Sequence, residues 1–156
     1  MLRVLATKVI HRLNRAVQQA NIVVHGRGNG PVAASLPKEG EPMPDLPIPR
    51  EWILEGNPVA TGRVLTISGD GGMVIGTWEC TAGRFHWIFD SDEFVQILGG
   101  EVHVEHEGKK LRLVEGDVAL FPIGSRTIWH VPERVRKTFV HRHPSPIMRE
   151  LLTIEG

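Results

Sequence analysis

The feature that most constrains the fold is a regular succession of short β-type runs that begins near residue 61. Apolar and polar residues alternate within these runs, and turns containing Gly or Pro separate them at intervals of about 8–12 residues. After a first run at 61–68, the runs are 73–79, 84–89, 93–98, 101–106, 110–114, 118–121, 127–131, 136–141 and 147–152. No helical pattern lies between them, which argues against parallel βαβ units. The spacing therefore predicts an all-β sandwich or barrel.

A two-residue turn at Glu107-Gly108 joins two of these runs. Gly108 supplies the positive φ that a tight hairpin turn requires. Before the turn, Val102 and Val104 alternate with polar residues. We therefore expect the valines inside the sheet and the polar residues on its outer face.

The residues before these runs divide into two segments. Residues 1–25 predict an amphipathic helical arm, since Leu5, Val9 and Leu13 recur every fourth residue and the other face is basic. Its interpretations are an arm packed on its own domain or a partner, an organellar presequence, and a surface for membrane or nucleic acid. Residues 26–50 repeat Gly and Pro and predict an extended strap. The folded body is expected at 51–156.

Length and composition set broad limits. With 156 residues and 41% hydrophobic content, the chain is expected to form one domain with a sizeable core. The net charge of +0 gives no sign of a nucleic-acid partner. Cys80 has no second cysteine to pair with, so we expect a reducing, cytoplasmic location, or an organelle if the arm is a presequence. No apolar run approaches the roughly 20 residues of a membrane span.

Two segments have the character of two halves of one binding site. Residues 83–100 and residues 116–129 both run strand, turn, strand, and both are bounded by Gly and Pro. Isolated polar residues stand within their apolar runs: His86 and Glu93 in the first segment and Thr127 in the second. Their spacing predicts a site formed by neighbouring strands.

The first segment resembles the first motif of the cupin superfamily. That motif has a glycine, two histidines one residue apart, a glutamate and a closing glycine. Gly83, His86, Glu93 and Gly100 match it in order, and Ile88 stands at the second histidine. Histidines one residue apart lie on one face of a strand. With the glutamate and a third histidine from neighbouring strands, they form a first-row metal site in the family.

The second segment resembles the second cupin motif. Gly116, Pro122 and Gly124 match its framework, and Thr127 stands where its histidine would be. Two of the four ligand positions are thus lost, and an isoleucine has no atom that binds a metal. The resemblance therefore leaves His86 and Glu93 as weak candidates for a loosely bound divalent transition metal and implies no firm cofactor.

Neighbouring residues narrow the resemblance to one branch of the family. The matching stretches are 78–83, 92–93, 121–124, 129–131 and 135–137. They resemble the branch that contains ureidoglycine aminohydrolase-like and ethanolamine-utilisation-type cupins. The resemblance implies a single-domain cupin jelly-roll barrel, and members of this branch commonly depart from the full set of metal ligands.

Strand parity predicts what lines the barrel, because every second residue of a strand shares one face. We expect the faces of His86, Glu93 and Thr127 to point inward together. The residues predicted to bind ligand on these faces are Ile88, Val95, Ile97, Thr127 and Trp129. A mostly apolar cavity with a few convergent polar groups is the usual form of a small-molecule pocket.

His86 has three interpretations. It is a neutral buried imidazole bonded to Glu93 or Thr127, a weak metal ligand together with Glu93, or one member of a catalytic His86–Glu93 acid–base pair without metal. Two protein ligands hold a metal weakly, since catalytic sites usually supply three.

Other residues carry simpler expectations. Cys80 is expected to be a small buried residue rather than a nucleophile. Trp129 is either a wall for the ligand or a plug that fills the barrel. Arg136 and Lys137 are expected at a solvated strand end, or else they guide an anionic substrate to the barrel mouth. Four histidines are expected to be exposed: His103, His106, His141 and His143.

Large apolar residues are also expected on the outer face. Phe94 and Leu98 oppose Glu93 in parity, and Phe85 and Trp87 oppose His86. So much exposed apolar surface needs cover, which predicts a homodimer through these faces or cover by the strap.

The sequence leaves three functions open. The first is a cupin-domain protein that binds a small polar metabolite in the barrel with an incomplete set of metal ligands. The second is an enzyme of the ureidoglycine aminohydrolase-like type that uses His86 and Glu93. The third is a non-catalytic dimeric accessory protein whose barrel is filled by Trp129.

Overall fold

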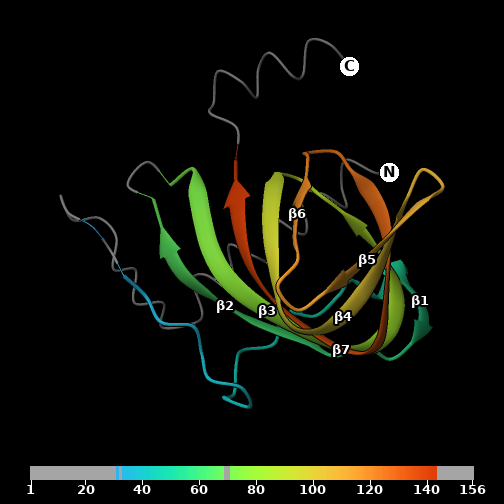
Figure 1. Cartoon of the computed structure of the whole chain (residues 1–156), viewed down its shortest axis with the longest axis horizontal. Coiled ribbons are helices and arrows are strands. Elements are labelled where there is room, and N and C mark those ends of the chain that lie inside the picture. The colour runs from blue at the N-terminus through green and yellow to red at the C-terminus, as the bar shows by residue number, and fades with distance from the viewer. Residues whose placement is uncertain (1–30, 32, 69–70, 144–156) are drawn as a thin grey trace, which may run out of the picture.

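The computed structural model describes residue 31, residues 33–68 and residues 71–143. Within them, strands pair antiparallel and curl into a barrel (Figure 1), which confirms the predicted all-β class. The elements are η1 (Arg50–Trp52), β1 (Ile53–Gly56), β2 (Ala60–Ile67), β3 (Met73–Ile88), β4 (Asp92–His106), β5 (Lys109–Val114), β6 (Val118–Phe121) and β7 (Arg126–Arg142). The described part of the chain contains no helix with the length and apolar character that a membrane crossing requires.

Three long strands form the frame of the barrel. The strand order is β1-β3-β7-β4-β5, with β2 also paired to β3 and β6 to β4. β3 exchanges β2 for β1 along its length, and β4 exchanges β6 for β5. β7 lies between β3 and β4 along nearly its whole length. Its inward residues therefore line the interior from one end of the strand to the other.

These long strands correct the predicted element bounds. The runs 73–79 and 84–89 merge in β3, the runs 93–98 and 101–106 in β4, and the runs 127–131 and 136–141 in β7. In β3 and β4, glycines between the merged runs mark β-bulges, where the register shifts between Thr81 and Gly83 and between Ile97 and Gly99. A bulge bends a strand without ending it. Gly100 makes one bend possible, because it has a φ of 69° and a Cβ there would lie 1.9 Å from the Arg134 carbonyl oxygen.

The turn at Glu107-Gly108 is the predicted hairpin. Both residues have positive φ, 48° at Glu107 and 78° at Gly108, as a type I′ turn requires. The turn pairs His106 with Lys109 and so sets the register of β4 against β5. Val102 and Val104 are buried by this register, as predicted.

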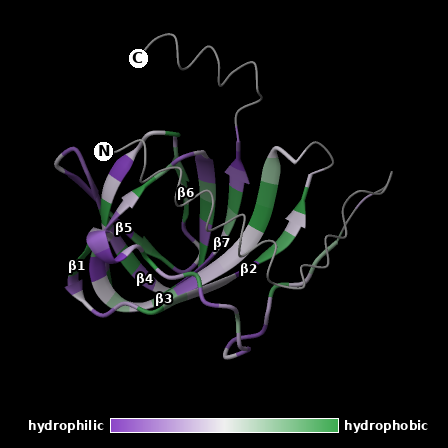
Figure 2. Cartoon of the chain, turned by 180° about the vertical axis from the view of Figure 1, so that it is seen from behind, coloured by the Kyte–Doolittle hydropathy of each residue, from purple (hydrophilic) through white to green (hydrophobic). Residues whose placement is uncertain are grey.

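The barrel interior takes alternate residues from each long strand, and hydrophobic and hydrophilic residues accordingly alternate along them (Figure 2). On β7, the inward residues between Thr127 and His141 are buried, and most are apolar. Gly76 of β3 admits the Phe139 ring, because a Cβ there would lie 2.5 Å from that ring. Burial of this apolar surface is the main force that holds the barrel together.

The described part of the strap is extended and joined to the barrel at several points. Glu39 pairs with Arg134 at 2.8 Å, and Pro37 accepts a hydrogen bond from Arg136 through its carbonyl oxygen. Asp45 forms a bridge with Thr61. Ile48 is buried in the core. The predicted helical arm and the predicted run at 147–152 lie outside the described residues.

Candidate functional site

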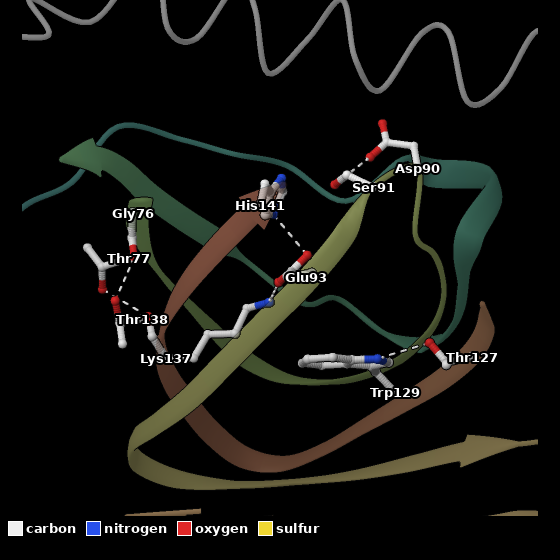
Figure 3. A network of polar contacts seen from close by, with 10 residues as sticks. All are labelled: Gly76, Thr77, Asp90, Ser91, Glu93, Thr127, Trp129, Lys137, Thr138 and His141. Atoms are coloured by element: carbon white, nitrogen blue, oxygen red, sulfur yellow. Dashed lines mark hydrogen bonds and ion pairs between the residues drawn. The ribbon is translucent and has the colours of Figure 1, made fainter. Parts of the chain in front are cut away.

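Three charged or titratable side chains meet inside the barrel. We call Glu93, Lys137 and His141 the charged cluster. Lys137 Nζ donates to Glu93 Oε1 at 2.5 Å, and His141 Nε2 lies 2.9 Å from Glu93 Oε2. The carboxylate of Glu93 therefore lies between a lysine and a histidine (Figure 3). Both members of the Glu93–Lys137 pair are almost fully buried, at 2% and 3% exposure.

The register of β4 against β7 creates this cluster. Glu93 is the direct partner of His141, and Ile97 is the partner of Lys137. The lysine therefore lies four residues from His141 on β7, and its long side chain extends over Phe139 toward the carboxylate. Two paired strands thus supply all three members of the charged cluster.

Aromatic rings surround the lysine nitrogen. Nζ of Lys137 lies 4.9 Å from the ring centroid of Trp129, 5.2 Å from that of Trp78 and 5.7 Å from that of Phe139. A ring face attracts a cation electrostatically within about 6 Å. These rings offset part of the cost of removing the ammonium from water.

The cluster keeps Glu93 ionised. Burial alone would raise the pKa of Glu93, but the charges and hydrogen bonds of Lys137 and His141 outweigh it and hold the pKa at about 2. The barrel therefore contains a permanent carboxylate at neutral pH. Its negative charge is balanced by the ammonium beside it.

Two further polar groups lie near the cluster. Burial raises the pKa of Asp90, against the opposing effect of His141 and His143. The Asp90 Oδ2 atom is buried and has no hydrogen-bond partner among the residues that the structure describes, whereas Oδ1 lies 3.4 Å from the Ser91 hydroxyl (Figure 3). Burial also raises the pKa of Cys80 to about 12, so this side chain is a buried thiol, as predicted, and not a thiolate nucleophile.

The rest of the interior is aromatic. Six rings form what we call the aromatic cluster: Trp78, Phe85, Trp87, Phe89, Phe121 and Trp129. Trp129 is 1% exposed and lies within 6.5 Å of each of the other five ring centroids. Its Nε1 donates to Thr127 Oγ1 at 3.0 Å, and that hydroxyl donates to the Trp87 carbonyl at 2.8 Å. The threonine hydroxyl is thus engaged within the wall.

The structure places most of the predicted binding residues inside the barrel. Glu93, Val95, Ile97, Thr127 and Trp129 are all buried, and Glu93 belongs to the charged cluster. Their role in binding a ligand stays a prediction. Thr127 and Trp129 lie together in the aromatic wall, away from solvent.

His86 is placed differently from the prediction, whereas Ile88 is partly buried and packs against the core. Phe85 and Trp87 pair with Trp129 and Thr127 of β7, whereas His86 pairs with Ile128 on the other face. His86 is exposed, and no contact joins it to Glu93 or Thr127 within the described residues. The expectation that its face of the strand points inward was therefore wrong. The cause is that the apolar rings at 85, 87 and 89 occupy the inward positions.

The same correction changes the fit to a metal. Trp87 and Phe89 precede Glu93 on the chain, and their rings offer no metal ligand; the buried Ser91 between Phe89 and Glu93 directs its hydroxyl to Asp90. Thr127 uses its hydroxyl within the wall, and Lys137 contacts the glutamate. Among the described residues, no group of three His, Cys, Asp or Glu side chains is arranged to hold a metal ion. These residues do not fit the metal site of the family motif.

Sequence reasoning missed the other two members of the charged cluster. The sequence predicts Lys137 at a solvated strand end, or as a guide for an anionic substrate at the barrel mouth, and His141 on the surface, yet both are buried inside the barrel. The signal was present in the parity of the strand, since Val135 and Phe139 are apolar and share a face with both. A lysine and a histidine on an apolar face are the pattern that would have found the site.

The amino-acid sequence matches a family model described as a EutQ-like cupin domain over residues 67–139. It is 29% identical over 101 residues to a protein of Salmonella typhimurium named acetate kinase EutQ. The match covers 56% of this chain and 44% of that protein. An Escherichia coli protein has the same name. The chain spans less than half the length of these two curated relatives, 44% and 36%.

Solved structures give the same assignment. A putative ethanolamine utilization protein Q of Salmonella typhimurium is 31% identical, with a TM-score of 0.51 over 56% of this chain and 72% of that chain. A cupin superfamily protein of Desulfitobacterium hafniense shares the fold, at 18% identity and a TM-score of 0.50 over 72% of this chain and all of that chain. The chain belongs to the cupin superfamily and, within it, to the EutQ-type branch.

Proposed function

We propose that this cupin domain binds a small polar metabolite that carries a carboxylate or a similar oxyanion, and that the charged cluster holds it. The observation that carries the proposal is the buried ammonium of Lys137, paired with Glu93 and surrounded by three rings. Such a pair contributes little to stability compared with apolar residues of the same volume. Its presence in an otherwise apolar interior therefore favours a role in binding.

Unused hydrogen-bonding capacity supports the proposal. An ammonium has three donors, and among the described residues Lys137 Nζ donates to one acceptor, Glu93 Oε1. Among the described residues, the Oδ2 atom of Asp90 has no hydrogen-bond partner, and Asp90 lies close enough to His141 and Glu93 for their charges to act on its pKa. A ligand with an acidic oxygen for the lysine and a donor for Asp90 would use both groups.

The name of the curated relatives, acetate kinase, makes acetate the first ligand to test. The panel adds propionate as a longer carboxylate, acetamide as a neutral analogue of acetate, and ethanolamine as a small cation. Acetamide keeps the shape of acetate without its charge. Ethanolamine reverses the charge and tests Glu93 and Asp90 as the anchoring groups.

Calorimetric titration and thermal unfolding would be measured for wild type and two variants. In the first variant, Glu93→Gln and Lys137→Met are combined, so that no buried charge is left without a partner. The second variant, Lys110→Met, is the matched control, because Lys110 is a surface lysine that pairs with Glu105 at 3.7 Å. We expect carboxylates to bind wild type and the control, and to lose at least about tenfold in affinity in the double variant.

Two outcomes would contradict the proposal. One is equal carboxylate binding by wild type and the double variant, which would place the ligand elsewhere. The other is preferential binding of ethanolamine over acetate, which would make the carboxylates the anchoring groups. A panel without any binding would instead favour the second candidate function.

The second candidate is a non-catalytic accessory domain. The observation that favours it is Trp129, which is buried in contact with five other rings and occupies part of the interior. In this case the charged cluster would be structural, and the outer face would carry the function. Phe94 is 39% exposed there, beside Leu120 at 65% on the neighbouring strand.

We also propose a homodimer through this outer face and a cytoplasmic location, which the free Cys80 favours. Two of the other predicted dimer residues, Phe85 and Trp87, face the interior and are excluded from the proposed interface. Sedimentation of wild type and Leu120→Asp would test the dimer. A monomeric wild type, or a dimer unaffected by the substitution, would contradict it.

A further inference from the structure

We infer that Lys137 is the resident cation of this barrel, and that its ammonium takes the place on Glu93 that a divalent metal ion takes in metal-bearing members of the family. Lys137 would hold this place with or without a bound metabolite. This role does not depend on which metabolite binds, and its test uses no metabolite.

The first observation that supports the inference is that the carboxylate of Glu93 is already occupied. Its two oxygens are both engaged, Oε1 by Lys137 at 2.5 Å and Oε2 by His141 at 2.9 Å. An ion that approached Oε1 would meet a like charge at contact distance, and like charges at a few ångströms in a weakly screened interior repel strongly. The lysine and a metal ion therefore exclude each other at this position.

The second observation is that aromatic rings surround the site. Trp87 and Phe89 precede Glu93 on the chain and offer rings where a metal would need nitrogen or oxygen ligands, and the hydroxyl of the buried Ser91 points to Asp90. Rings are poor ligands for a first-row metal but attract an ammonium. Trp78, Trp129 and Phe139 accordingly surround Nζ at 4.9–5.7 Å. The chemistry of the whole wall fits a lysine cation.

One consequence can be measured directly. Removing the lysine side chain would leave a buried carboxylate and the adjacent His141 imidazole without a cation, and these are two ligands of the kind that divalent transition metals prefer. Lys137→Ala should therefore create a weak metal site that wild type lacks. The metal would also restore stability, since it binds the folded state and not the unfolded one.

Cobalt(II) is the probe, because its visible absorption reports the coordination it adopts. Metal-stripped wild type, Lys137→Ala, and Lys137→Ala combined with Glu93→Gln would be titrated with Co²⁺ and followed by absorption and thermal unfolding. Lys110→Ala is the matched control, since Lys110 is a surface lysine paired with Glu105. We expect Lys137→Ala alone to gain one site, at least about tenfold tighter than the wild-type background, and to unfold at a higher temperature with Co²⁺. The gain should disappear when Glu93 is also replaced.

A folded Lys137→Ala variant that gains no Co²⁺ affinity would overturn the inference. Should that variant fail to fold, wild type and Glu93→Gln decide the matter. We expect the two to bind Co²⁺ equally, because Lys137 already occupies the carboxylate. Co²⁺ binding by wild type that Glu93→Gln abolishes would show that the glutamate holds a metal beside the lysine, and would contradict the inference.

Discussion

The interior of the barrel contains two regions of opposite chemistry that lie side by side. The aromatic cluster is uncharged, and its hydrogen bonds run within the wall, from Trp129 to Thr127 and from Thr127 to the Trp87 carbonyl. The charged cluster buries Glu93 and Lys137 almost completely, and its stability depends on every member finding its partner. The contact between the two regions is the cation of Lys137, which lies over the ring of Trp129.

The difference separates what the fold needs from what a site needs. Rings that contact one another gain from burial whatever else the protein does. A buried ion pair gains little over apolar residues of equal volume, but losing one partner costs a great deal. We therefore expect the aromatic cluster to dominate folding stability, and the charged cluster to show strong coupling between its members.

The largest expected effect is on the aromatic side. Trp129→Ala removes a ring that contacts five others and leaves a cavity, which should lower the free energy of unfolding by about 4 kcal/mol. Urea unfolding followed by circular dichroism measures this loss. Leu111→Ala, at an exposed position of β5, should change stability by less than about 0.5 kcal/mol. Similar losses for the two variants would remove the distinction between the aromatic cluster and the surface.

The next effect tests the coupling within the charged cluster. Lys137→Met leaves the Glu93 carboxylate with His141 alone, so we expect a loss of about 3 kcal/mol in unfolding free energy. The combined Glu93→Gln and Lys137→Met variant should lose clearly less than the sum of the single losses. A double-mutant cycle in urea at neutral pH gives the coupling energy. Additive losses would mean that the two side chains do not act as a pair.

The barrel fold could be predicted from the sequence more fully than the charged cluster inside it. The turn at Glu107-Gly108 and the framework residues Gly116, Pro122 and Gly124 predicted the barrel, because turn chemistry is local. Glu93 could be predicted from its place in a motif. The motif alone could not predict its partners, since a motif says nothing about which side chains from a distant strand reach it.

For His86, the motif led to a wrong prediction that the local pattern of apolar residues would have avoided. A histidine near the expected position was assigned to the interior, although Phe85, Trp87 and Phe89 form an apolar face on the alternate positions. Burial decides strand parity more strongly than the identity of one residue. The apolar face of β7 would have found Lys137 and His141 by the same rule.

The third effect is a pH dependence that only the charged cluster should produce. The pKa of Glu93 is about 2 in the folded protein, below its ordinary value of 4.5. The unfolded chain therefore binds more protons as the pH falls. The stabilising contribution of the ionised Glu93 is complete above about pH 4.5 and is lost as the pH falls toward 2. The loss in unfolding free energy amounts to about 2 kcal/mol between pH 7 and pH 3. Unfolding free energies across this range should fall more steeply for wild type than for Glu93→Gln. Parallel curves would mean that Glu93 titrates normally in the folded state.

The smallest expected effect is at His86, and it tests the corrected strand parity. The side chain is exposed on the outer face of β3, so His86→Ala should change the free energy of unfolding by less than about 0.5 kcal/mol. Trp87→Ala is the matched comparison on the next residue, and it should lose several times more because its ring packs against Trp52 and Trp78. His86→Ala should also leave carboxylate binding unchanged. If His86→Ala abolished binding while Trp87→Ala did not, the outer face of β3 would carry the site, and the charged cluster would be a structural feature of the interior.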